Sequence, residues 1–254
     1  MYRNGRMEPL PDLPHPVEEA SLTFNKGKAR LCGGQTNNIS YSKQCYELSI
    51  FATSPKWEKF ADLPVAMTGH SSIQVRDDMW VFYRTKTYVV SQTGNTMQFK
   101  WPHGAIPPYS CAETNGVSTI LIPGQSRDVY INSDVTSPET WQKFATLPTG
   151  PRGRSCLLLG LVMYVTGGGD PAVQESYMIN IETGSVKKVS DLLAGRRYHG
   201  MCVIDGAPAV FGGYNGTFID STEIFDVATE TWRASNIKMV EQSYDVASVS
   251  FAIN

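Results

Sequence analysis

Three pairs of glycines follow short apolar runs and are the first residues whose type and spacing could do chemistry. They are Gly33-Gly34, Gly167-Gly168 and Gly212-Gly213. Glycine loops bind phosphate when they lead into a helix N-terminus, because free backbone N–H groups there point at the anion. The residues after the third pair, YNGTFIDSTEIF, read as a loop and then a strand, and no GxxxxGK[ST] pattern occurs. The glycines therefore indicate strand ends where backbones crowd and φ is unusual, rather than a phosphate site.

Cysteine and histidine could form disulfides or hold a metal. The five cysteines are odd in number and contain no CxxC pair, which disfavours a zinc site or a disulfide framework. They are Cys32, Cys45, Cys111, Cys156 and Cys202. We expect buried free thiols that act as small hydrophobic residues, with a bridge between Cys32 and Cys45 across a hairpin as the alternative. The four histidines are scattered, so we predict no metal and no cofactor.

Composition and charge remove several classes of function. The chain has 254 residues and a net charge of −2, and no run of basic residues suggests a nucleic-acid surface. No stretch approaches 18 consecutive apolar residues, so we expect no membrane span. The first residues lack the apolar segment of a signal peptide. With the odd cysteine count, this favours a cytoplasmic location, and a secreted location stays open.

The tryptophans reveal a period along the chain. Trp57 and Trp101 are 44 positions apart, Trp101 and Trp141 are 40 apart, and Trp232 follows Trp141 by 91. The last interval is about two periods and leaves an empty slot at Val186. The glycine pairs recur with the same spacing, which is typical of a repeat protein.

Each period contains four short strands. The last unit reads YHGMCVI, a tight turn at Asp205-Gly206, APAVF, then the alternating STEIFDV, and finally TWRA. Five units are complete: 18–60, 67–101, 108–144, 152–189 and 196–235. Four-stranded sheets that repeat in this way bury their faces by stacking radially, which predicts an all-β propeller forming a single domain over 1–254.

The number of blades depends on how the chain ends are used. We expect six blade positions, with a thin terminal blade built from RMEPLPDLP at the start and YDVASVSFAI at the end. Five blades with an extra terminal strand are the alternative, and a fragment of a longer chain is the third possibility.

The repeat resembles the kelch family. The best match, 196–235, has a basic residue before the first strand, Gly212-Gly213, the Glu-x-Phe-Asp sequence that starts at Glu223, and Trp232. The resemblance implies a non-enzymatic scaffold that binds a protein or peptide, including actin or a ubiquitin-ligase component, and it implies a kelch protein without a BTB domain. The glycine pairs and Trp57, Trp101, Trp141 and Trp232 are then structural repeat residues, with the tryptophans in the inter-blade core.

The resemblance also implies a partner site on one loop face. In kelch ubiquitin-ligase adaptors, arginines at the position of Arg152 and Arg197 bind acidic peptides. Neighbouring candidates lie beside these arginines or in adjacent loops: Arg154, Arg196, Tyr198, Tyr109, His70, Arg127, Tyr214 and Asn215. The alternative is that the arginines pack the blades against carboxylates or carbonyls. Three units depart from the pattern with Glu18, Met67 and Pro108 at the arginine position.

Three alternatives remain at this stage. Asn38 and Asn215 begin glycosylation sequons, which matter only if the chain is secreted. A propeller enzyme of galactose-oxidase-like or hydrolase type is possible, although no GxSxG elbow appears. The chain could also be a structural subunit of a larger assembly, such as an actin-associated one.

Overall fold

The computed structural model describes residues 2–3, 6–7, 9–36 and 40–239. All of the regular secondary structure in these ranges is β-strand. These residues form no helix long and apolar enough to cross a membrane.

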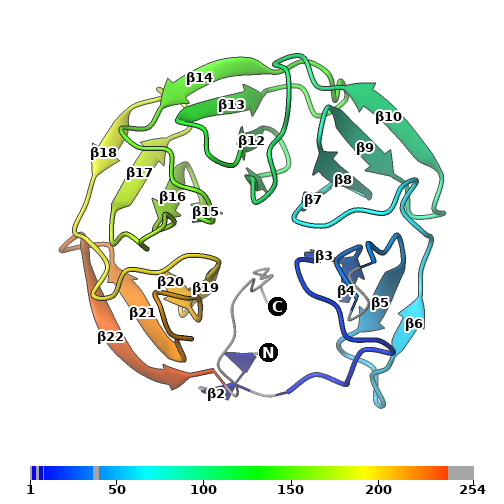
Figure 1. Ribbon diagram of the computed structural model, residues 1–254, viewed down its shortest axis with the longest axis horizontal. Coiled ribbons are helices and arrows are strands. Elements are labelled where there is room, and N and C mark those ends of the chain that lie inside the picture. The colour runs from blue at the N-terminus through cyan, green and yellow to red at the C-terminus, as the bar shows by residue number, and fades with distance from the viewer. Residues whose placement is uncertain (1, 4–5, 8, 37–39, 240–254) are drawn as a thin grey trace. The chain divides into compact units, whose positions relative to one another are not determined.

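Five four-stranded sheets, which we call blades 1 to 5, account for most of the strands (Figure 1). Blade 1 contains β3 (Ser21–Asn25), β4 (Lys28–Cys32), β5 (Cys45–Ser49) and β6 (Trp57–Lys59). Blade 2 contains β7 (Ser71–Val75), β8 (Asp78–Tyr83), β9 (Lys86–Val90) and β10 (Thr96–Lys100). Blade 3 contains β11 (Cys111–Thr114), β12 (Thr119–Ile122), β13 (Asp128–Asn132) and β14 (Gln142–Thr146). Blade 4 contains β15 (Ser155–Leu159), β16 (Val162–Thr166), β17 (Ser176–Asn180) and β18 (Val186–Lys188). Blade 5 contains β19 (Gly200–Ile204), β20 (Ala207–Phe211), β21 (Ser221–Asp226) and β22 (Thr231–Lys238).

The strand order confirms the predicted all-β fold with propeller blades. In every blade each strand pairs with the next one along the chain, so each sheet is a simple meander. The five sheets agree with the five-bladed alternative rather than the six positions that we expected first. At the start of the chain β1 (Tyr2–Arg3) and β2 (Arg6–Met7) form a separate two-stranded sheet. The expected closing strand at 244–253 lies outside the described residues.

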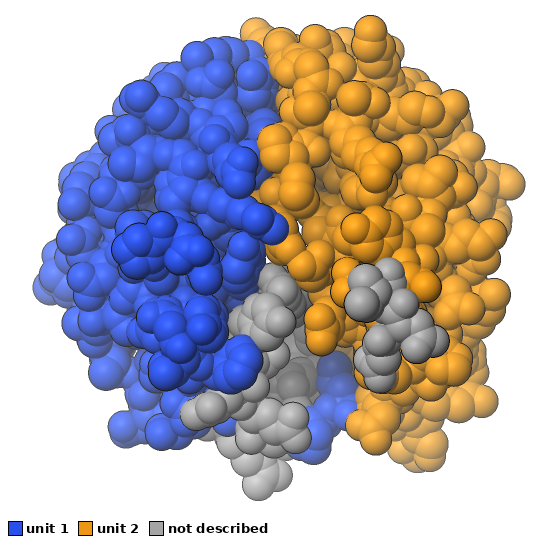
Figure 2. Space-filling view, in the orientation of Figure 1, with its two compact units in different colours: residues 1–10, 122–130, 143–254 blue, residues 11–121, 131–142 orange. Residues whose placement is uncertain are grey.

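The chain divides into two compact units (Figure 2). Unit 1 comprises residues 1–10, 122–130 and 143–254 and contains blades 4 and 5. Unit 2 comprises residues 11–121 and 131–142 and contains blades 1 and 2. Strands of blade 3 belong to both units. A single domain over 1–254 stays a prediction.

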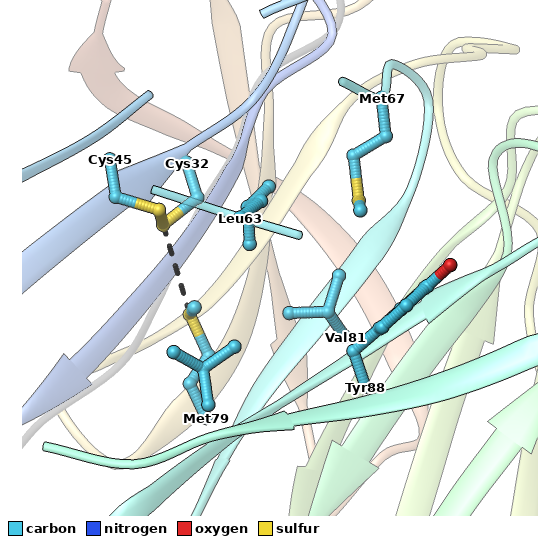
Figure 3. Close-up of a cluster of buried hydrophobic side chains, with 8 residues drawn as sticks. Cys32, Cys45, Leu63, Met67, Met79, Val81 and Tyr88 are labelled. Carbon is cyan, nitrogen blue, oxygen red and sulfur yellow. Dashed lines mark hydrogen bonds between the residues drawn. A yellow bond between two sulfur atoms is a disulfide. The ribbon is translucent and has the colours of Figure 1, made fainter. Parts of the chain in front are cut away.

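Blades 1 and 2 share a buried cluster in unit 2 (Figure 3). Its members are Cys32, Cys45, Leu63, Met67, Met79, Val81, Tyr88 and Val90. Cys32 and Cys45 lie directly opposite each other on β4 and β5 and form a disulfide. The expectation of free thiols was wrong at these two positions, where the bridge that we held as the alternative is present, and also at Cys111 and Cys156, which are disulfide-bonded as well. Cys202 is a free thiol, as predicted. Disulfides are typical of oxidising compartments, so these cysteines do not support the expected location.

Blades 4 and 5 share a second cluster in unit 1. Its members are Leu157, Tyr164, Leu192, Met201, Val210, Phe225 and Trp232. The rings of Tyr164 and Phe225 meet edge to face at 5.4 Å, and the Trp232 ring lies 5.1 Å from Phe225. The Trp232 indole N–H donates to Ser176 Oγ in blade 4 at 3.0 Å. Trp232 therefore contributes to the inter-blade core, as predicted.

The empty tryptophan slot is confirmed by the strand register. Trp57 faces Leu48, Val186 faces Ile179 and Trp232 faces Phe225, each at the start of a fourth strand. Trp141 likewise directly precedes β14. These positions are equivalent, with valine replacing tryptophan in blade 4.

Trp101 was wrongly assigned to this series. It follows the end of β10, whereas Met97 of β10 pairs with β9 near the position where the other blades carry tryptophan. Trp101 is buried and packs on Trp141 at 5.0 Å, and Phe82 meets the Trp141 ring edge to face at 5.6 Å. Trp57 and Trp101 are 44 residues apart, which fits the period, but they occupy different positions of their blades: Trp57 begins a fourth strand and Trp101 follows one.

The glycine pairs adopt positive φ, as expected for strand ends. Gly33, Gly167 and Gly212 have φ of 69°, 61° and 65°, and Gly34, Gly168 and Gly213 have 93°, 92° and 97°. A Cβ on Gly167 would lie 2.3 Å from the carbonyl oxygen of Arg196 and 2.8 Å from the His199 ring. Gly33 and Gly167 therefore permit close approach of the next blade, whereas Gly34, Gly168 and Gly213 lie against the loop that enters their own blade. No helix follows the pairs in the described chain.

Candidate functional site

The predicted arginine position of each repeat unit lies in the loop that enters the blade, three residues before the first strand. Counted from the strand starts, the residues at this position are Glu18, Thr68, Pro108, Arg152 and Arg197. The position in blade 2 is therefore Thr68, one residue later than the Met67 that the period suggested. The predicted equivalence of Arg152 and Arg197 is confirmed.

In each entry loop the residue directly after this position forms backbone hydrogen bonds with its counterpart in a neighbouring blade. These residues are Glu19, Gly69, Tyr109, Gly153 and Tyr198. In unit 1, Tyr198 N–H donates to the Gly153 carbonyl at 2.8 Å. In unit 2, Gly69 N–H donates to the Glu19 carbonyl at 3.1 Å and Tyr109 N–H donates to the Gly69 carbonyl at 2.8 Å. All five residues have positive φ, which non-glycine residues seldom adopt, so the loop conformation is imposed by this inter-blade pairing.

An open pocket of about 320 Å³ lies in unit 1 at the entrance to blade 5 and is lined by Arg197, Tyr198, Tyr214 and Phe218. Arg197 and Tyr214 exchange two backbone hydrogen bonds of 3.0 Å, and Tyr214 forms a further β-bridge with Phe218. The rings of Tyr214 and Phe218 meet edge to face at 5.6 Å. A short backbone ladder outside the main sheet thus positions the four side chains.

Arg197 occupies the centre of this group. Its guanidinium carbon lies 5.6 Å from the Tyr198 ring centre and 5.4 Å from that of Tyr214, within the range of cation–π attraction. Its Nη1 lies 2.8 Å from Asp170 Oδ2 and donates to the Gly169 carbonyl at 3.4 Å. The Arg197 side chain is 20% exposed, whereas that of Asp170 is 79% exposed.

Arg152 and Asn215 lie near the same group. Arg152 is exposed, and its guanidinium carbon lies 6.0 Å from the Tyr198 ring centre, so two arginines lie close to the Tyr198 ring. Asn215 is exposed in the hairpin between Tyr214 and Phe218, and its Oδ1 accepts a hydrogen bond from the Thr217 hydroxyl at 3.2 Å. The arrangement offers guanidinium donors beside aromatic faces, which suits a ligand with both an anionic and an apolar part.

Comparison with known protein families identifies the repeat. Residues 195–235, which include the loop entering blade 5 and most of that blade, match the family model of the Kelch motif. The chain is a β-propeller whose fifth blade carries a Kelch motif. Among curated proteins no sequence matches it.

Two of the predicted arginines in this propeller are buried and do not face the pocket. Arg196 is fully buried, pairs with Glu223 at 2.7 Å and donates to the Gly212 carbonyl at 2.9 Å. Arg154 is buried and donates to the Ser126 carbonyl at 2.8 Å, and burial lowers its pKa to about 10. For these two residues the blade-packing alternative is correct.

His70 is also a correction. It is buried and its Nε2 lies 2.8 Å from Ser21 Oγ, and burial lowers its pKa to about 4. His199, at the same place before blade 5, lies 2.8 Å from Thr166 Oγ1. This pairing of a buried imidazole with a hydroxyl of the preceding blade recurs, so it is a packing contact of the repeat.

Tyr109 and Arg127 lie in other settings. Tyr109 is half-buried in unit 2, where its hydroxyl donates to Glu19, which also accepts a hydrogen bond from Thr68 at 2.7 Å. Arg127 is exposed and its Nε donates to the Leu147 carbonyl at 2.9 Å. Neither residue lines the pocket. In the ranges that the structure describes, no group of three His, Cys, Asp or Glu side chains could hold a metal ion.

Asp170 and Phe218 were missed from the sequence. Both lie in loops between a second and a third strand, where we considered the residues directly after the glycine pairs. The sequence signal that could have identified Phe218 is a large apolar residue in a segment predicted to be a loop. The structure leaves the Phe218 side chain 47% exposed. Asp170 has no comparable signal, because its role depends on a contact with Arg197 across 27 residues.

Proposed function

We propose that this propeller is a non-catalytic scaffold that binds a protein or peptide partner through the loops at the entrance to blade 5. Kelch propellers are commonly protein-interaction scaffolds. The observation that carries the proposal is the open pocket in which the Arg197 guanidinium lies 5.6 and 5.4 Å from the ring centres of Tyr198 and Tyr214, with Phe218 exposed in the lining.

The chemistry of the pocket supports a peptide ligand. Tyrosine and arginine are enriched among the residues that dominate binding energy, because they combine a large apolar surface with fixed donors. Arg152 and Arg197 add positive charge beside these rings. An extended segment with an acidic and an apolar side chain would use both features. By resemblance to other kelch proteins, actin and ubiquitin-ligase components are the first partners to be tested.

The test is a selection of peptides from a display library on the immobilised protein, followed by affinity measurements. Arg197→Ala and Tyr214→Ala should each weaken the selected peptides about tenfold or more, since truncating a central interface residue costs roughly 1–2 kcal/mol or more.

Arg233→Ala is the matched control, because Arg233 is an exposed arginine of the same unit on β22 and does not line the pocket. Melting curves would verify that each variant is folded. Peptides that bind Arg197→Ala and wild type equally would refute the proposed site.

A further inference from the structure

We propose that Asp170 is a built-in competitor for the Arg197 guanidinium and thereby determines which ligands the pocket accepts. The inference rests on the proposed function, because it concerns the same pocket. In the structure the Asp170 carboxylate occupies the Nη1 edge of Arg197 at 2.8 Å, where the carboxylate or phosphate of a ligand would bind.

The Asp170 carboxylate can be displaced at little cost. Its side chain is 79% exposed, so it regains full hydration when it leaves. Ion pairs with such an exposed partner contribute little, because solvent screens the charges and holding both side chains costs entropy. The pair therefore orients the guanidinium without holding it permanently.

Arg197 remains in place when Asp170 leaves. Its guanidinium stays beside the rings of Tyr198 and Tyr214, and its Nη1 keeps a hydrogen bond of 3.4 Å to the Gly169 carbonyl. Only the carboxylate must be exchanged, so the positioned donor is available to an incoming anion without rearrangement of the backbone ladder between Arg197 and Tyr214. A neutral ligand that displaced Asp170 would lose this ion pair without replacing it, and is disfavoured by the small free energy that the pair contributes.

The test measures binding of inorganic phosphate to the whole chain by NMR titration, following the backbone amide signals of Tyr198 and Tyr214, which line the pocket and remain when Arg197 is replaced. Asp170→Asn keeps the shape of the side chain and removes its charge. It should tighten phosphate binding about two- to fivefold, the range expected from removing an exposed ion pair. Arg197→Gln should abolish the gain when it is combined with Asp170→Asn.

Asp191→Asn is the matched control. Asp191 is an exposed aspartate of the same unit that pairs with Lys188 at 3.3 Å, so this variant changes the net charge equally at another place. It should leave the phosphate affinity unchanged. Equal affinities of wild type and Asp170→Asn, or an equal gain in Asp191→Asn, would overturn the proposal.

The two proposals fail in distinguishable ways. If selected peptides depend on Arg197 but Asp170→Asn binds phosphate no tighter than wild type, the pocket is the partner site and Asp170 is no competitor. If Asp170→Asn gains affinity for phosphate but no peptide depends on Arg197, the competitor is real and the proposed function is wrong.

Discussion

Arg196 and Arg197 are neighbours in the chain, and their replacement should lower the stability of the protein by very different amounts. Arg196 is fully buried, pairs with Glu223 at 2.7 Å and donates to the carbonyls of Gly212 and Ser221 at 2.9 and 3.1 Å. Arg196→Met would leave the buried Glu223 carboxylate without its cation. Breaking a buried pair in this way costs about 3–5 kcal/mol.

This cost translates into a large change in melting temperature. For a chain of this size each kcal/mol corresponds to roughly 2–4 °C, so Arg196→Met should lower the midpoint by about 10 °C. Arg197→Met loses a pair with an exposed carboxylate and partly exposed ring contacts, worth about 1 kcal/mol, and should shift the midpoint by only a few degrees. Circular dichroism melts of the two variants measure the difference.

A double variant separates the unpaired charge from the lost packing. The backbone N–H groups of Leu193 and Ala194 donate to the two oxygens of Glu223 at 2.7 and 3.2 Å. Arg196→Met/Glu223→Gln removes both charges and keeps an acceptor oxygen for one of these N–H groups. It should be more stable than Arg196→Met alone. A double variant no more stable than the single one, or Arg197→Met as damaging as Arg196→Met, would refute the reasoning.

Three further predictions concern stability. Gly167→Ala places a Cβ 2.3 Å from a backbone oxygen at a φ of 61°, so it should lower the free energy of unfolding by about 2–3 kcal/mol or more in denaturant titration. An unchanged free energy of unfolding would mean that the blades can separate there. Burial lowers the pKa of His70 to about 4, so the unfolded state takes up a proton first and stability should fall as the pH drops from about 6.5 to 4. His70→Gln should flatten that part of the pH profile, and an unchanged slope would contradict the assignment. Replacing Cys32 and Cys45 together by alanine removes a disulfide between residues 13 positions apart and should lower the free energy of unfolding by about 3 kcal/mol. Unchanged denaturation midpoints would show that the disulfide contributes nothing to stability.

Most of the fold could be predicted because it depends on local pattern. Alternating polar and apolar residues define strands such as β21, and Asp205-Gly206 adopts the positive φ of 50° and 80° that its predicted tight turn requires. The period of the repeat also predicts that Arg152 and Arg197 occupy the same position in two blades. The aromatic period misassigned Trp101, because spacing alone does not distinguish the start of a fourth strand from its end.

The candidate site was only partly predictable, since it depends on contacts between distant residues. The sequence does not show that Arg196 meets Glu223 while Arg197 meets Asp170, and these contacts decide which arginine is structural. Likewise, the opposition of Cys32 and Cys45 follows from strand register rather than from their spacing.

The most direct test of the partner site uses site-specific photo-crosslinking from two exposed residues of blade 5. Phe218 precedes β21 at the pocket and is 47% exposed, whereas Val227 follows the other end of β21 and is 55% exposed. A benzophenone amino acid at each position, irradiated with the selected peptide bound, reports which end of the blade the ligand contacts. We predict crosslinks from position 218 that Arg197→Ala removes and none from position 227. Crosslinks from 227, or equal yields from both positions, would contradict the proposal that the pocket is the binding site.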